Sequence, residues 1–171
     1  SIGVQDASNQ NFGIYAFDPG TQLSVQNGDT IVKLSGGADY SMGLCLNSEA
    51  EAFLSGHTDV TVQDNAGVNY GLYVADSAVL DAAGTAVRAS GGEVAYGIYL
   101  TSSGKSTFSN TLNVAASDAS DDNIGMIVQD GSELSAQDAV IASDGTAIIA
   151  SESKVSFAGN VVTDADATAV G

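Results

Sequence analysis

The chain has 171 residues, enough for one domain, with 44% hydrophobic residues to fill a core and only 6% aromatic residues. Lys and Arg number 4 against 21 Asp and Glu, so the formal net charge is -17. A surface this acidic repels phosphate backbones, anionic lipid headgroups and acidic polysaccharides, so we expect no nucleic-acid partner. No apolar run approaches the ~18 residues of a transmembrane helix, so we expect no membrane insertion by this segment.

A short segment with a glycine between bulky apolar residues recurs along the chain, as in NYGLYV (69–74) and AYGIYL (95–100). In chain order the copies are FGIYA (12–16), MGLCL (42–46), YGLYV (70–74), YGIYL (96–100), IGMIV (124–128) and TAIIA (146–150), and AVG (169–171) resembles the start of another. Successive copies are 22 to 30 residues apart. A bounded interval of this size indicates a repeat architecture.

Two more apolar stretches follow each glycine segment. The second stretches are LSV (23–25), FL (53–54), VL (79–80), TF (107–108), LSA (134–136) and VSF (155–157). The third are TIVKL (30–34), DVTV (59–62), TAVRA (85–89), TLNVA (111–115), AVIA (139–142) and NVV (160–162). Polar turns separate them, and no window keeps the apolar spacing of a helix. We therefore predict an all-β chain that folds as a parallel β-helix, a right-handed β-solenoid of about six coils with three short strands each.

Alternation along an extended strand assigns the faces of each glycine segment. The residues before, one after and three after the glycine form the more apolar set, so we expect them inside the coil, Tyr70 among them. The glycine and the residue two after it should then point outward. This outward column contains Tyr15, Tyr73 and Tyr99, which are our candidate binding residues.

Two explanations of the glycine column stay open. A bare strip beside the tyrosines would leave a shallow trough for a ligand, a loop of the chain or a neighbouring copy. Alternatively, glycine simply allows a bend at the start of the strand, and the tyrosines stack as ordinary ladder neighbours.

The sequence offers no catalytic constellation. SSGKST (102–107) lacks the first glycine of a phosphate-binding loop, since Tyr99 holds that position. His57 is the single histidine, too few for a zinc site, and no Gly-x-Ser-x-Gly segment supplies a nucleophile. In four coils of a column five residues after the glycine, carboxylates alternate with serine, which spaces like charges apart instead of pairing them as a glycosidase does. That column is Asp18, Ser48, Asp76, Ser102, Asp130 and Glu152.

We therefore predict that the protein is not an enzyme and has no catalytic residues, no metal ligands and no cofactor. An incidental Ca²⁺ in the oxygen-rich loop ASDASDDN (116–123) is the one exception left open. The single cysteine, Cys45, has apolar neighbours and should behave as a small buried or half-buried hydrophobic residue.

The segments NYGLYV and AYGIYL, the SGG turns (35–37 and 90–92), the scarcity of cysteine and the acidic charge resemble the passenger region of bacterial autotransporter adhesins. These passengers are long right-handed parallel β-helices exported through the outer membrane by a C-terminal β-barrel. The resemblance covers all 171 residues and is one of repeat style. It implies an extracellular or bacterial cell-surface location, and it implies that residues 1–171 are a single β-solenoid domain within a longer repetitive chain.

The leading hypothesis is a non-enzymatic adhesin-like stalk or contact surface, whose partner is a protein or glycan on a cell surface. The alternative is a structural protein that assembles with copies of itself by stacking its end coils into a filament or matrix. A third hypothesis is a carbohydrate-active enzyme or a phage tailspike fragment.

Overall fold

The computed structural model describes residues 1–5, 9–37 and 39–167. This part of the chain forms 16 strands and no helix, which confirms the predicted all-β class. Every strand pair is parallel, and the chain winds as a β-solenoid of about 5 turns. The turn count is slightly below the six coils expected. The segment 169–171, which resembles a further copy, lies outside the described residues.

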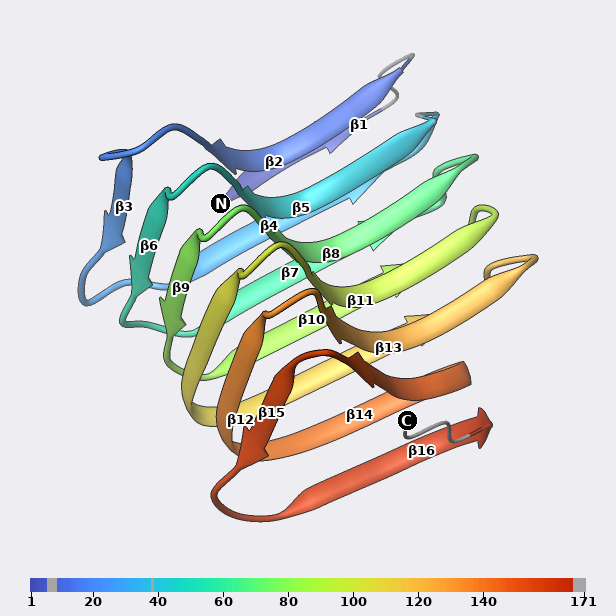
Figure 1. Ribbon diagram of the computed structural model, residues 1–171. Coiled ribbons are helices and arrows are strands. Elements are labelled where there is room, and N and C mark those ends of the chain that lie inside the picture. Colours follow the sequence, from blue (N-terminus) through green and yellow to red (C-terminus); the bar gives the residue numbers. More distant parts are fainter. Residues whose placement is uncertain (6–8, 38, 168–171) are drawn as a thin grey trace.

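The solenoid has three faces, visible in Figure 1 as three stacks of parallel strands. Face A contains β2 (Gln10–Ala16), β5 (Tyr40–Leu46), β8 (Val68–Val74), β11 (Val94–Leu100), β13 (Asp122–Gln129) and the end of β14 (Glu133–Ser151). Face B contains β3 (Gln22–Val25), β6 (Glu51–Leu54), β9 (Val79–Ala82), the starts of β12 (Lys105–Ser117) and β14, and β15 (Lys154–Phe157). Face C contains β1 (Ile2–Gln5), β4 (Thr30–Ser35), β7 (Thr58–Gln63), β10 (Thr85–Ser90), the later part of β12, the middle of β14, and β16 (Val161–Ala167).

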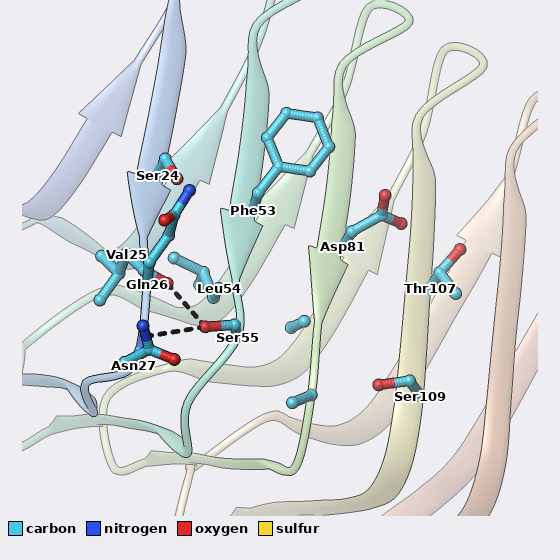
Figure 2. Close-up of a pocket in the computed structure, with 12 residues that line it drawn as sticks. Ser24, Val25, Gln26, Asn27, Phe53, Leu54, Ser55, Asp81, Thr107 and Ser109 are labelled. Atoms are coloured by element: carbon cyan, nitrogen blue, oxygen red, sulfur yellow. Dashed lines mark hydrogen bonds between the residues drawn. The ribbon is translucent and has the colours of Figure 1, made fainter.

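Equivalent residues of successive turns are paired in register, so each column of side chains runs along the solenoid. On the outer side of face B, for example, Ser24, Phe53, Asp81 and Thr107 are successive partners (Figure 2). The period varies because the connections at all three corners differ in length between turns, whereas the strands keep their pairing.

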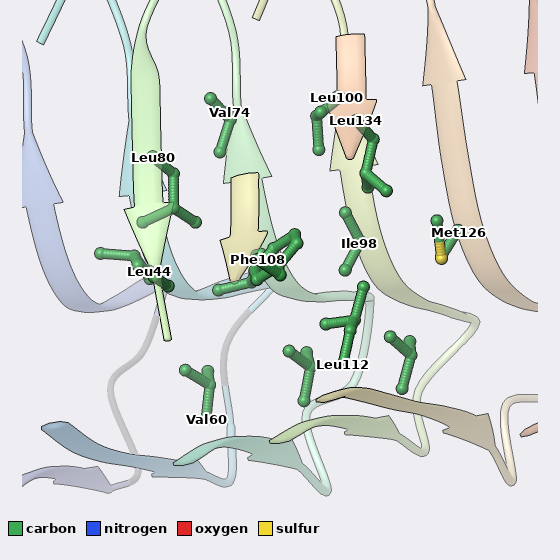
Figure 3. Close-up of a cluster of buried hydrophobic side chains, with 14 of the residues drawn as sticks. Leu44, Val60, Val74, Leu80, Ile98, Leu100, Phe108, Leu112, Met126 and Leu134 are labelled. Atoms are coloured by element: carbon green, nitrogen blue, oxygen red, sulfur yellow. The ribbon is translucent and has the colours of Figure 1, made fainter. Parts of the chain in front are cut away.

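The core fills the inside of the coil with aliphatic side chains from all three faces (Figure 3). Leu72 and Val74 come from face A, Leu80 from face B and Val87 from face C, and each is at most 1% exposed. Phe108 is the one aromatic ring among the largest fully buried side chains. Residues one and three after each glycine are therefore inside, as predicted.

The glycine column also faces the interior, which corrects the outward placement predicted from alternation. A Cβ built on Gly71 would lie 2.2 Å from Cγ1 of Val87 on face C and 2.6 Å from the carbonyl oxygen of Gly97. Gly13, Gly43 and Gly97 meet the corresponding valines of their own turns at 2.2–2.3 Å. Figure 1 shows that the strands of face A bend at mid-strand towards face C, which brings the glycines close to the valines of that face. Glycine is required there because a side chain would occupy the space of the opposing valine.

This bend overturns the inward placement of the residue before the glycine. Gly71 and Leu72 both turn inward, so the alternation slips by one residue, as at a β-bulge. Tyr70 consequently lies on the outer side together with Tyr73, and their ring centroids are 5.5 Å apart. Phe12 and Tyr96 of that column follow the same geometry and lie on the outer side, whereas Ile124 of the same column is only 9% exposed.

Polar side chains brace the loops that lead into face A. Asn69 is fully buried and donates hydrogen bonds from Nδ2 to the carbonyl oxygens of Ser90 (3.2 Å) and Gly91 (2.8 Å). Asn11 donates in the same way to the Gly36 carbonyl at 3.1 Å. These amides donate to carbonyls where Gly36 and Gly91 take positive φ and the chain leaves the strands of face C.

Candidate functional site

Aromatic side chains gather on the outer side of face A. We call this set the aromatic face, and it consists of Phe12, Tyr15, Phe17, Tyr40, Tyr70, Tyr73, Tyr96 and Tyr99. They come from β2, β5, β8 and β11 and from the first residue after β2. No other described part of the chain places so many rings in contact.

Four tyrosines on β8 and β11 form one continuous cluster. The ladder pairs Tyr70 with Tyr96 and Tyr73 with Tyr99. Tyr73 and Tyr99 stack with ring centroids 5.7 Å apart and planes 12° apart. Tyr70 meets both of these rings edge-on, at 5.5 and 5.6 Å. Edge-to-face and offset contacts of this kind stabilise by about 0.5–1.5 kcal/mol per pair beyond the area they bury.

A second cluster lies on the first turn. Tyr15 stacks on Phe12 at 5.0 Å and on Phe17 at 5.3 Å, and Tyr40 meets Phe12 edge-on at 6.1 Å. Tyr15 and Phe17 are the most exposed rings of the aromatic face, at 50% and 48%. Such exposure of adjoining rings leaves apolar surface available to a partner.

Cys45 lies between the two clusters. The ladder places it after Tyr15 and before Tyr73, and these larger neighbours leave it 3% exposed. Burial raises the pKa of its thiol to about 12, so it carries no thiolate at neutral pH. Cys45 thus behaves as the buried small hydrophobic residue that its neighbours predict.

Acidic and amide groups border the aromatic face where the chain turns towards face B. Gln129 donates hydrogen bonds from Nε2 to the Tyr99 hydroxyl oxygen (3.1 Å) and to the Asp130 carboxylate (3.2 Å). Burial raises the pKa of Tyr73, with smaller contributions from Cys45, Tyr99 and Asp76. Burial also raises the pKa of Tyr70 to about 12. Tyr70 and Tyr73 are therefore neutral at physiological pH and present hydroxyl groups beside a row of carboxylates.

The acidic column has a conformational role at this border. Asp18, Ser48, Asp76, Ser102, Asp130 and Glu152 all have positive φ, between 48° and 80°. Asp tolerates this left-handed conformation better than most residues, and the turns also stack, with Ser103 N donating to the Asp130 carbonyl at 2.9 Å. The column thus occupies the same corner in each turn.

Of the predicted binding residues, Tyr15, Tyr73 and Tyr99 all lie on the aromatic face. Tyr15 is exposed, and Tyr73 and Tyr99 are half-buried by their neighbours. The sequence-based assignment missed Tyr70 and Tyr96, which were placed in the core. The available signal was the glycine itself, because glycine inside a strand often marks a bulge that breaks the alternation.

The segment SSGKST does not have the structure of a phosphate-binding loop. In SSGKST, Ser102 and Ser103 form a left-handed turn and Lys105 begins β12, so a strand follows where a phosphate loop needs a helix. No group of three His, Cys, Asp or Glu side chains that could hold a metal ion occurs among the described residues. The same part of the chain contains no helix long and apolar enough to cross a membrane.

Comparisons with known proteins found no match among protein-family models, curated proteins or solved structures. The fold and the aromatic face therefore rest on the chain's own residues.

Proposed function

We propose that the protein is a non-enzymatic, adhesin-like β-solenoid of the extracellular or bacterial cell surface, and that the aromatic face is its contact surface. The observation that carries the proposal is the row of partly exposed aromatic rings held in register on face A. Tyrosine is enriched where proteins bind one another, because it offers apolar area and a hydroxyl group at low entropic cost.

Ring geometry favours a protein partner at this face. Tyr73 and Tyr99 cover each other's ring faces, as do Tyr15 and Phe17. The rings therefore present edges and hydroxyl groups, which suit peptide and side-chain contacts better than the stacking of a sugar ring. The neighbouring Asp76 and Asp130 favour basic groups around the rim of the partner's surface.

Repetition along the solenoid gives the proposed mechanism. The rungs are spaced by about 4.8 Å, so similar side chains recur at a fixed pitch on a stiff support. Individually weak contacts then add, because binding one rung holds the next close to its own partner group.

Binding of the fluorescently labelled chain to intact epithelial and bacterial cells, measured by flow cytometry, tests the proposal. We expect the double variant Tyr73→Ala/Tyr99→Ala to lose most of the bound signal. The double variant Tyr73→Phe/Tyr99→Phe, which keeps the stacked rings, should lose only the part due to the hydroxyl groups. Val140→Ala removes an exposed side chain from face C and is the matched control. Equal binding by all four proteins would refute the aromatic face as the contact surface.

Negative-stain images and light scattering at increasing concentration test the alternative, in which copies stack end to end. Rods longer than one chain that persist in the Tyr73→Ala/Tyr99→Ala variant would favour assembly over adhesion.

A further inference from the structure

A second surface with different chemistry lies on the outer side of face B. It is a groove of about 650 Å³, lined by residues 24–27, 53–55, 81–83, 107 and 109. Figure 2 shows the groove crossing β3, β6, β9 and β12, where these strands turn towards face C. It shares no residue with the aromatic face.

Phe53 is the aromatic centre of this groove and is 39% exposed. Its ladder neighbours are Ser24 on one side and Asp81 on the other. Neither side chain covers its ring, and no other ring contacts it in the described part of the chain. Phe53 therefore offers a free aromatic face, unlike the mutually stacked tyrosines of face A.

Polar groups surround this ring in positions fixed by the ladder. The carboxylate of Asp81 is exposed on the next rung and the hydroxyl of Thr107 on the rung after it (Figure 2). At the far edge, the Ser55 hydroxyl accepts a hydrogen bond from the Asn27 backbone N–H (3.0 Å) and donates one to the Val25 carbonyl (3.2 Å). Asp81 forms no ion pair within the described residues, so its oxygens are available to donors from a ligand.

We propose that this groove binds an uncharged oligosaccharide. One face of a pyranose ring is a patch of C–H groups, which packs on an open aromatic ring, while its hydroxyl groups donate well to a carboxylate. The net charge of -17 disfavours uronic acids and sialylated glycans. Successive rungs are about 4.8 Å apart, close to the length of one hexose unit, so Phe53, Asp81 and Thr107 can contact neighbouring units of one extended chain.

Saturation-transfer NMR and titration calorimetry with defined oligosaccharides test this site. The uncharged probes are cellotetraose, maltotetraose, mannotetraose and triacetylchitotriose, and the charged probe is trigalacturonic acid. We expect at least one uncharged probe to bind, with millimolar or better affinity, and trigalacturonic acid to bind more weakly.

Variants of the two central residues locate the binding. Phe53→Ala and Phe53→Leu should each weaken binding by about tenfold, whereas Phe53→Tyr, which keeps the ring, should bind as the unaltered chain does. Asp81→Ala should weaken binding by a similar factor, since it removes a charged acceptor. The Tyr73→Ala/Tyr99→Ala variant should bind the oligosaccharide normally, which separates this site from the contact surface proposed above.

Circular dichroism establishes that each variant is folded before it is compared. The proposal is wrong if no uncharged probe shows saturation transfer. It is also wrong if Phe53→Leu and Asp81→Ala bind as well as the unaltered chain, or if trigalacturonic acid binds best.

Discussion

Substituting Gly71 by alanine should destabilise the solenoid severely. The added Cβ would lie 2.2 Å from Val87 Cγ1 and 2.6 Å from the Gly97 carbonyl oxygen, both well inside normal contact distance. Overpacking a core costs about 1–3 kcal/mol when side chains can move, and more when the backbone must shift. Because one of the two clashing atoms is a backbone oxygen, we expect a loss of about 3 kcal/mol or more in the free energy of unfolding.

A double variant separates the two clashes. Val87→Ala alone removes two buried methyl groups and should cost about 1.5 kcal/mol. Combined with Gly71→Ala, it relieves the side-chain clash and leaves the backbone clash. The loss in the double variant should therefore fall short of the sum of the single losses by about 1–2 kcal/mol.

Chemical denaturation followed by far-ultraviolet circular dichroism measures these differences. Gly84→Ala is the matched control, because a Cβ there would meet its nearest atom, His57 Nδ1, at an ordinary 3.6 Å. It should change stability by no more than about 0.5–1 kcal/mol. If Gly71→Ala were tolerated as well as Gly84→Ala, or if the Gly71 and Val87 losses were strictly additive, the inward placement of the glycine column would be refuted.

Two further predictions concern buried polar groups. Asn69→Ala should lower the free energy of unfolding by about 1–3 kcal/mol in urea denaturation, because the partly buried Gly91 carbonyl loses its side-chain donor and the Ser90 carbonyl keeps only the Asp64 backbone N–H. An unchanged midpoint would contradict this role of Asn69. Burial raises the pKa values of Cys45 (from 9.0) and Tyr70 (from 10.0) to about 12, because the folded protein favours the neutral forms of both side chains. The contribution of these neutral side chains to folding stability is therefore complete below pH 9 and is lost as the pH rises towards 12. Denaturation at several pH values should accordingly show a free energy of unfolding that falls above pH 9, and the fall should be less steep in the Tyr70→Phe variant. Reaction of the Cys45 thiol with Ellman's reagent at pH 8 without denaturant would contradict the burial of Cys45.

Much of the fold follows from the sequence, because a parallel solenoid repeats its own pattern. Equivalent residues stack in register, so the recurrence of segments such as NYGLYV and AYGIYL predicts both the rungs and their pairing. The burial of Leu72 and Val74 follows from the apolar character of their columns, and that of Cys45 from its apolar neighbours in the sequence.

The placement of Tyr70 could not be obtained in this way. Strict alternation assumes a straight strand, whereas the inward turn of both Gly71 and Leu72 depends on how closely face A approaches Val87 on face C. That distance is a property of the assembled coil, and within the strand only the glycine signals it. The groove around Phe53 was missed for a similar reason, since it is formed by four strands whose outward residues differ in type.

The outward position of both tyrosine columns is the central structural claim, and the stability of Tyr70→Lys compared with Leu72→Lys tests it most directly. Tyr70 lies on the outer surface, so Tyr70→Lys should remain folded and lose about 1–2 kcal/mol of unfolding free energy. Leu72 is 0% exposed, so Leu72→Lys would bury an unpaired charge and should not fold. Failure of Tyr70→Lys to fold, with Leu72→Lys folding normally, would contradict the account.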